Sequence, residues 1–279
     1  MILSKQLGAK AAPAARSLVN HLRVNSLFRN SVYIMTTTAL TAATGYLFWI
    51  LAARMYPPKD VGLASALIGT MMLAATLANL GIGPTLIQSL PRRKSGEEWS
   101  LTLNAVFFTG ILASLTTGTI AAIALPILSP KLTVAGQESG FTLALIAGVP
   151  LLSLAALLDS TFTAERMAGN MLARTATFAF MRIPLLIAPV LLGHAGAIVI
   201  CLAWVLAAGS GVAMGVSLIP RLKRDYRFVR SGIFAQMRSL LSQVAGHQLI
   251  SFGALAPIYL LPLIVVTRLS LAENAYFYT

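Results

Sequence analysis

One charged side chain stands in the middle of a long apolar segment. Arg182 follows Phe178-Ala-Phe-Met and precedes Ile-Pro184. A charge at the centre of a bilayer costs at least about 2.5 kcal/mol, so it should face a cavity or a partner. Arg182 is therefore the first candidate for binding an anionic group. The alternatives are a structural ion pair with Asp159 and a side chain that reaches the membrane interface. Pro184 and Pro189 predict a break in the helix that carries Arg182.

Three further residues could share a cavity with Arg182. Asp159 lies near the end of an apolar segment, where it could either line the cavity or cap the helix end at the interface. Tyr33 and Thr37 give another apolar segment a small polar face, which is suited either to lining a cavity or to helix packing. We expect Arg182, Asp159, Tyr33 and Thr37 to contribute to a substrate site.

A later apolar segment also carries polar residues, Gln243 and His247. Polar side chains within such segments usually turn toward a bundle interior, so we expect Gln243 and His247 to contribute to the same substrate site. His247 could take up and release a proton or make a hydrogen bond between helices. Arg54 and Arg268 stand at the ends of apolar segments, where they would anchor the interface or form the charged rim of a cleft.

No arrangement of residues predicts an enzyme. The sequence contains no nucleophile elbow, no HExxH pair, no phosphate-binding loop and no dinucleotide glycine pattern. The acidic residues do not form a carboxylate pair within an apolar segment, and the single cysteine, Cys201, gives no metal-binding spacing. We therefore predict no catalytic residue, no metal site and no cofactor.

The composition identifies an integral membrane protein. The chain has 279 residues, of which 57% are hydrophobic and only 10% are charged, whereas soluble proteins carry about 25% charged residues. The net charge of +13 could suggest nucleic acid as a partner. Basic loops that set the orientation in a membrane are the better explanation, so membrane lipids are expected partners and nucleic acid is not.

The apolar segments are continuous for about 20 residues or more, which favours transmembrane helices over the alternating strands of a barrel. We therefore predict an all-α, polytopic membrane protein. The predicted spans are 31–53, 63–90, 101–128, 141–162, 172–192, 195–220 and 239–266, and a further one begins near Ala272.

The basic residues predict the orientation of these spans. Sixteen of the 21 Lys and Arg residues fall on the side of the N-terminus, four fall on the other side, and Arg182 lies within a span. Because positive loops stay in the cytoplasm, we expect a multi-pass protein of the inner (cytoplasmic) membrane with a cytoplasmic N-terminus.

The first two spans and the corner between them resemble a known family. The corner Ala-Arg-x-x-x-Pro-x-x-x-Gly-Leu and the later Leu-Gly-Ile-Gly run are similar to those of the oligosaccharide flippases, the Wzx-like polysaccharide biosynthesis proteins of the MOP superfamily, which are related to MATE exporters. The residues that carry the resemblance are Ala53, Arg54, Pro58, Gly62, Leu63, Leu80, Gly81, Ile82 and Gly83. From the residues alone, Gly81 and Gly83 indicate a helix end or close packing.

The resemblance implies two lobes of six helices joined on the cytoplasmic side. A weak internal repeat agrees, since aligning Arg54 with Arg268 also aligns Leu47 with Leu261 and Ile50 with Ile264. We expect a basic N-terminal segment (1–30), a six-helix N-lobe (31–220), a basic inter-lobe linker (221–238) and the start of a C-lobe (239–279). The chain would then be part of a protein with about 12 to 14 spans.

The resemblance also implies a function. It predicts a transporter that flips a polyprenyl-diphosphate-linked oligosaccharide across the cytoplasmic membrane for cell-surface polysaccharide biosynthesis, by alternating access between the lobes. The partners would be membrane lipids, the lipid-linked glycan and other membrane proteins of polysaccharide assembly. The alternatives are a MATE-like exporter of small cations, which should carry an acid deep in the N-lobe, and a non-transporting scaffold of a polysaccharide assembly complex.

Overall fold

The chain folds into a bundle of long helices. The computed structural model describes residues 26–79, 81–128, 139–223, 225–228, 232–238, 261 and 264. The elements are α2 (Ser26–Met55), α3 (Pro58–Asn79), α4 (Ile82–Ser89), the 3-10 turn η1 (Leu90–Arg92), α5 (Gly96–Leu128), α7 (Ser139–Ala164), α8 (Ala168–Leu191) and α9 (Ala197–Leu222).

Six of these helices, α2, α3, α5, α7, α8 and α9, are long and apolar enough to cross a membrane. No strand occurs among the residues that the structure describes. The prediction of an all-α polytopic membrane protein is confirmed, and the first six predicted spans each correspond to one of these helices. The seventh predicted span, 239–266, lies almost entirely outside the described residues.

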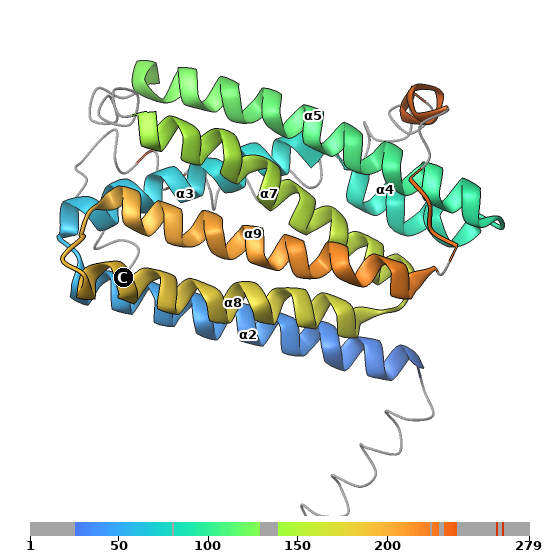
Figure 1. Ribbon diagram of the computed structural model, residues 1–279, viewed down its shortest axis with the longest axis horizontal. Coiled ribbons are helices and arrows are strands. Elements are labelled where there is room, and N and C mark those ends of the chain that lie inside the picture. The colour runs from blue at the N-terminus through green and yellow to red at the C-terminus, as the bar shows by residue number, and fades with distance from the viewer. Residues whose placement is uncertain are drawn as a thin grey trace, which may run out of the picture.

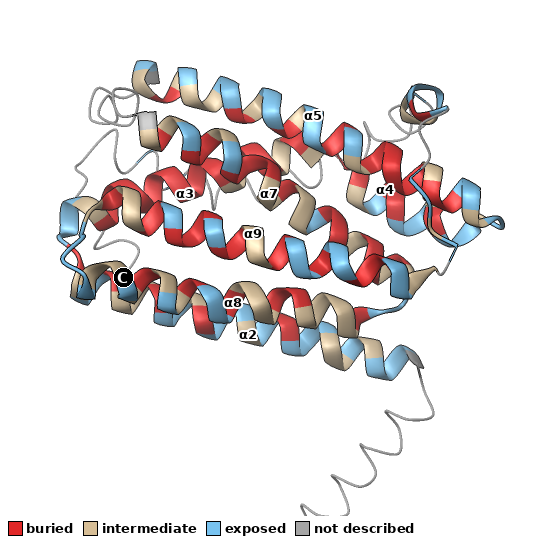
Figure 2. Ribbon diagram, in the orientation of Figure 1, coloured by how far each residue is buried: buried red, intermediate tan, exposed pale blue. Residues whose placement is uncertain are grey.

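The helices run roughly parallel or antiparallel to one another (Figure 1). Helix α3 packs against α5, α7 and α9, and most of its residues are buried. Helix α2 packs mainly against α8 and leaves much of its surface exposed, as Figure 2 shows. Exposed apolar side chains on α2 and α5, such as Met35, Ile123 and Ile127, are what a lipid-facing surface requires.

Tyr56 joins the short corner between α2 and α3 to α8. Its side chain is buried, and its hydroxyl donates a hydrogen bond to the carbonyl of Leu186 at 2.7 Å. Burial raises the pKa of the Tyr56 phenol, so the donor proton is retained throughout the neutral range. This bond fixes the corner against the end of α8.

The predicted second span, 63–90, is wrong in its extent. Helix α3 starts earlier, at Pro58, and ends at Asn79, and the separate helix α4 begins at Ile82. Gly81, which precedes α4, has a φ of 68°, a left-handed conformation that glycine adopts without a steric cost. Gly83 packs closely, because a Cβ there would lie 2.8 Å from the Ser160 hydroxyl oxygen. The break between α3 and α4 was not predicted because the sequence is apolar on both sides of it.

The expected break at Pro184 and Pro189 is also wrong, since α8 continues to Leu191. A proline inside a helix removes one backbone hydrogen bond and costs about 3 kcal/mol. Packing against α2 and α9 retains the helical path in spite of this cost.

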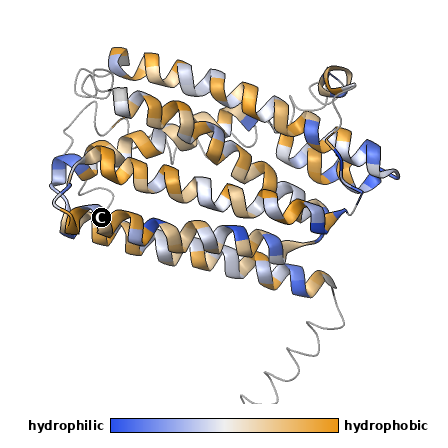
Figure 3. Cartoon of the chain, viewed as in Figure 1, coloured by the Kyte–Doolittle hydropathy of each residue, from blue (hydrophilic) through white to orange (hydrophobic). Residues whose placement is uncertain are grey.

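Most of the described charged side chains lie near the helix ends. Arg92, Arg93, Lys94, Arg166 and Lys223 lie at the end of the bundle where α7 and α9 finish and α5 begins; we call this the basic end. Figure 3 shows hydrophilic residues there and mainly apolar residues along the middle of the helices. Arg54 and Lys59 belong to the opposite end.

Candidate functional site

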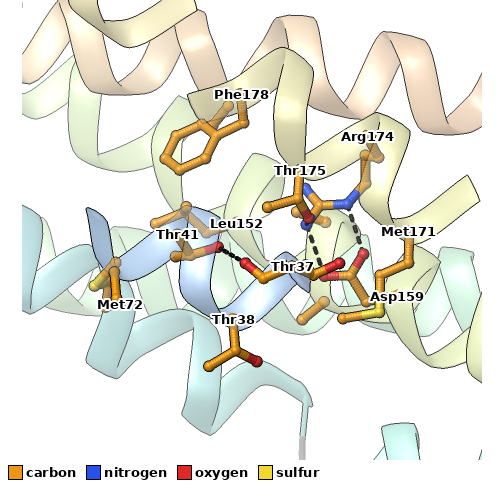
Figure 4. Close-up of a pocket in the computed structure, with 14 residues that line it drawn as sticks. Thr37, Thr38, Thr41, Met72, Leu152, Asp159, Met171, Arg174, Thr175 and Phe178 are labelled. Atoms are coloured by element: carbon orange, nitrogen blue, oxygen red, sulfur yellow. Dashed lines mark hydrogen bonds and ion pairs between the residues drawn. The ribbon is translucent and has the colours of Figure 1, made fainter. Parts of the chain in front are cut away.

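A cavity of about 520 Å³ opens among five of the membrane-length helices. It lies on the side of the bundle where α2 faces α7 and α8, and Figure 4 shows its polar and apolar walls. The lining residues are Thr37, Thr38, Thr41 and Ala42 of α2, Met72 of α3, Leu152, Ala155, Ala156 and Asp159 of α7, Met171, Arg174, Thr175 and Phe178 of α8, and Ala208 of α9.

An ion pair between α7 and α8 supplies the charge of this cavity. Arg174 donates from Nε to Asp159 Oδ1 at 2.6 Å and from Nη2 to Asp159 Oδ2 at 2.7 Å. Nη2 also donates to the hydroxyl of Thr175 at 2.9 Å. The Arg174 side chain is 8% exposed and that of Asp159 is 23% exposed. This two-point contact is the strong, charge-assisted geometry, and it holds a cation within the membrane-spanning part of the bundle.

Two glycines of α9 make room for Arg174. Gly211 and Gly215 are four residues apart, so they lie on one face of the helix. A Cβ on Gly215 would lie 3.2 Å from both Cγ and Cδ of Arg174 and 2.8 Å from Cδ1 of Leu158. A Cβ on Gly211 would lie 3.3 Å from the Arg174 carbonyl oxygen. Small residues at this spacing let helices approach closely in membranes, and here they form the groove that positions the Arg174 side chain.

Replacing Gly215 with alanine should therefore disturb the ion pair. We expect Gly215→Ala to cost about 1–3 kcal/mol, the usual cost of overpacking, because the side chains of Leu158 and Arg174 must both move. Thermal unfolding in detergent would measure the loss. Gly209→Ala is the matched control on α9, since among the described residues its Cβ would meet only Leu151 Cδ1, at 3.7 Å. Equal stability of the Gly215→Ala and Gly209→Ala proteins would contradict the packing argument.

Threonines of α2 form another wall of the cavity, and Figure 4 shows Thr37, Thr38 and Thr41 along it. The Thr37 hydroxyl donates to the Tyr33 carbonyl at 2.8 Å, and the Thr41 hydroxyl donates to the Thr37 carbonyl at 2.8 Å. Because each proton is used within the helix, each hydroxyl oxygen remains as an acceptor. The cavity thus combines a cation with hydroxyl acceptors, a combination suited to a ligand that carries phosphate and sugar hydroxyl groups.

Arg182 lies behind the cavity wall and does not line the cavity. Its side chain is 1% exposed; Nη2 donates to the Thr44 hydroxyl and to the Thr41 carbonyl. The guanidinium carbon is 4.9 Å from the ring centre of Phe178 and 5.2 Å from that of Trp204. Cation–π contacts of this kind compensate a buried charge. Arg182 Nε has no hydrogen-bond partner among the described residues.

The other predicted residues divide into three groups. Thr37 and Asp159 line the cavity. Tyr33 does not line it and instead packs beside Gly169 at the contact of α2 with α8, and Arg54 is exposed near the end of α2. Gln243, His247 and Arg268 lie outside the described residues. Whether any of these residues binds substrate stays a prediction.

Two expectations about the ion pair are corrected. Asp159 does not cap a helix end, because α7 continues to Ala164, and its partner is Arg174 and not Arg182. The sixteen basic residues assigned from the sequence to the side of the N-terminus include Arg174, yet the structure buries Arg174 within α8. A signal existed: Asp159 and Arg174 are seven and eight residues from Arg166, and an antiparallel hairpin with its turn at Arg166 brings them to the same level.

Comparison with known proteins decides the family. The family model for polysaccharide biosynthesis proteins matches residues 27–269, which is most of the chain. The chain belongs to this family. It is the family of the Wzx-like flippases and other MOP superfamily members, so the resemblance seen in the sequence is confirmed. No curated protein and no solved structure gave a match.

Family membership and the helices together support a coarse function. Members of this polysaccharide biosynthesis family are transporters rather than enzymes, and the six membrane-length helices agree with a multi-pass membrane protein. The protein is thus a membrane transporter related to polysaccharide biosynthesis, with lipid and glycan as the expected classes of ligand.

Proposed function

We propose that the protein flips a polyprenyl-diphosphate-linked oligosaccharide across the cytoplasmic membrane for cell-surface polysaccharide biosynthesis. The observation that carries the proposal is the Arg174–Asp159 pair, a cation and its counter-ion held in a cavity among membrane-length helices. Ionisable residues inside a membrane are expensive and usually mark a substrate or ion path. A diphosphate is the most highly charged part of such a substrate, and an arginine is the residue that suits it best.

The ion pair gives the cavity two states. With Asp159 bound, Arg174 is neutralised and the empty site is stable in an apolar environment. A diphosphate carries more negative charge than a carboxylate and can take over both donors of the Arg174 guanidinium. The hydroxyl oxygens of Thr37 and Thr41, whose protons are used within α2, accept hydrogen bonds from the sugar hydroxyls. In the absence of substrate, Asp159 thus occupies the Arg174 donors that the diphosphate would take.

Alternating access requires a second half of the cleft. In this proposal residues 31–220 form the N-lobe, residues 221–238 link the lobes, and residues 239–279 begin the C-lobe. Substrate enters from the cytoplasmic side, on which the N-terminus lies, and rocking of the lobes turns the cleft outward. Arg182 adds positive potential from behind Phe178 and contacts substrate only if α2 moves away from α8.

The charge of the cavity also helps to decide between a flippase and a MATE-like exporter of small cations. Asp159 is an acid in the N-lobe, but both of its oxygens accept hydrogen bonds from Arg174. The pair therefore offers a cation no net negative charge. This favours an anionic substrate over a cationic one.

Binding of a fluorescent polyprenyl-diphosphate sugar to the purified protein tests the proposal. Arg174→Gln should weaken binding about tenfold or more, because a hydrogen bond to a charged group contributes about 1.5–3 kcal/mol. Asp159→Asn should tighten binding, because the competing anion is removed while an acceptor oxygen remains. Opposite effects at the two partners identify Arg174 as a diphosphate ligand. Equal weakening in both variants would return the pair to a structural role, and no binding by the wild type would favour a non-transporting scaffold.

A further inference from the structure

A second cavity, of about 260 Å³, lies at the basic end of the bundle. Three cations from three different connections line it: Arg93 after η1, Arg166 in the turn between α7 and α8, and Lys223 after α9. The remaining walls include Trp99 of α5 and Glu165. None of these residues lines the cavity of Arg174 and Asp159, so this is a separate site.

The charge of this second cavity is not balanced. Within the part of the chain that the structure describes, none of the three cations lies within 4.0 Å of a carboxylate oxygen. Glu165, the one acid among the described residues of the wall, accepts a hydrogen bond from Trp99 Nε1 at 2.7 Å. The Nε atom of Arg93 is buried and has no hydrogen-bond partner among the described residues. Buried donors in native proteins are nearly always paired, so an unpaired one in a basic cavity points to an anion.

The backbone at Arg166 is held in an unusual conformation. Its φ is 56°, in the left-handed region, and Arg166 is the one non-glycine residue with positive φ among those described. The Met167 amide donates to the Phe162 carbonyl at 2.8 Å and the Arg166 amide to the Thr163 carbonyl at 3.1 Å. These two bonds form a Schellman motif at the end of α7, in which arginine occupies the left-handed position that is usually glycine. Strain of this kind is typical of functional positions, and here it coincides with a cation that lines the cavity.

The position of the cavity indicates the ligand. Its residues lie at or just beyond the ends of α5, α7 and α9, three helices that are long and apolar enough to cross a membrane. This places the cavity at the level of lipid headgroups. Its volume is well over ten times the 15 Å³ or so that one water molecule needs. Basic pockets between transmembrane helices on the cytoplasmic side suit anionic headgroups. We propose that this cavity binds the phosphate headgroup of an anionic membrane lipid, held by Arg93, Arg166 and Lys223.

Thermal unfolding of the full-length protein in detergent, with and without lipid, tests this proposal. A short-chain phosphatidylglycerol at about 100 times its Kd should raise the Tm of the wild type by roughly 5 °C or more, and phosphatidylcholine should not. The rise should be lost in Arg93→Gln/Lys223→Gln. It should be retained in Arg92→Gln/Lys94→Gln, which removes the same charge from exposed neighbours that do not line the cavity.

Arg166→Gly provides a second variant that should remain folded. Glycine relieves the left-handed strain, so its Tm without lipid should be at least that of the wild type, while its response to phosphatidylglycerol should fall. Three results would overturn the proposal: a full response in Arg93→Gln/Lys223→Gln, an equal loss in Arg92→Gln/Lys94→Gln, or the whole response from inorganic phosphate alone. The last result would identify a site for a soluble phosphate and not for a lipid.

Discussion

Removing either partner of the Arg174–Asp159 pair is expected to destabilise the protein by about 3 kcal/mol. Breaking a buried ion pair on one side costs about 3–5 kcal/mol, because the remaining charge is left without compensation. The lower value applies here because Asp159 is 23% exposed. Asp159→Ala should lower the Tm by roughly 6 °C or more in detergent. Arg174→Ala should have a similar effect.

The double variant Asp159→Ala/Arg174→Ala separates charge from packing. It leaves no unpaired charge, so it should be more stable than either single variant, with a coupling energy within the 0.5–3 kcal/mol found for residues in contact. Additive losses of less than 1 kcal/mol for each single variant would mean that the two side chains do not stabilise each other. This double-mutant cycle isolates one interaction, because no other described residue forms an ion pair with either Asp159 or Arg174.

Arg182→Ala is expected to destabilise the protein by a comparable amount, whereas Arg182→Met is not. The Arg182 side chain fills the space between Phe178 and Trp204 and is 1% exposed. Alanine would leave a cavity there, and large-to-small replacements of this kind cost about 2–5 kcal/mol. Methionine retains most of the volume and removes a charge whose Nε has no partner among the described residues. Replacing a buried charge with an apolar side chain is often neutral or stabilising.

Comparing the stability and transport of these two Arg182 variants reveals why the arginine is present. If Arg182 supplies positive potential to the neighbouring cavity, Arg182→Met should fold as well as the wild type and transport more slowly. Thermal unfolding and uptake measured on one preparation would show this. A marked loss of stability in Arg182→Met would show instead that the guanidinium and its bonds to α2 hold the bundle together.

The sequence predicted the six helices because a bilayer demands long, continuous apolar segments. It did not predict the break between α3 and α4, since apolar composition reports burial and not backbone direction. Gly81 and Gly83 carried that information, and they indicated a helix end or close packing without deciding between them. The helix through Pro184 shows the opposite case, in which packing against neighbours outweighs a local preference.

The candidate site was predicted only in part. Asp159 and Thr37 do line the cavity, because polar side chains in apolar segments turn inward. Arg182 was predicted to be a site residue because it lies in the middle of an apolar segment. Its aromatic neighbours from α2 and α9 are brought together only by the fold, so its buried position behind the cavity was not predicted. Arg174 was overlooked because it is near a helix start, where a basic residue is usually explained by membrane orientation. Only the antiparallel register of α7 and α8 pairs it with Asp159.

The most direct test of the proposed function is translocation in proteoliposomes. The full-length protein would be reconstituted with a fluorescent polyprenyl-diphosphate sugar, beside the neutral pair Asp159→Asn/Arg174→Gln and the exposed control Lys59→Gln. The neutral pair retains hydrogen-bonding groups and should remain folded. If Arg174 is the cation that receives the diphosphate, transport should fall at least about tenfold in the neutral pair and remain at the wild-type level in Lys59→Gln. Wild-type transport by the neutral pair would contradict a role for this ion pair in substrate recognition.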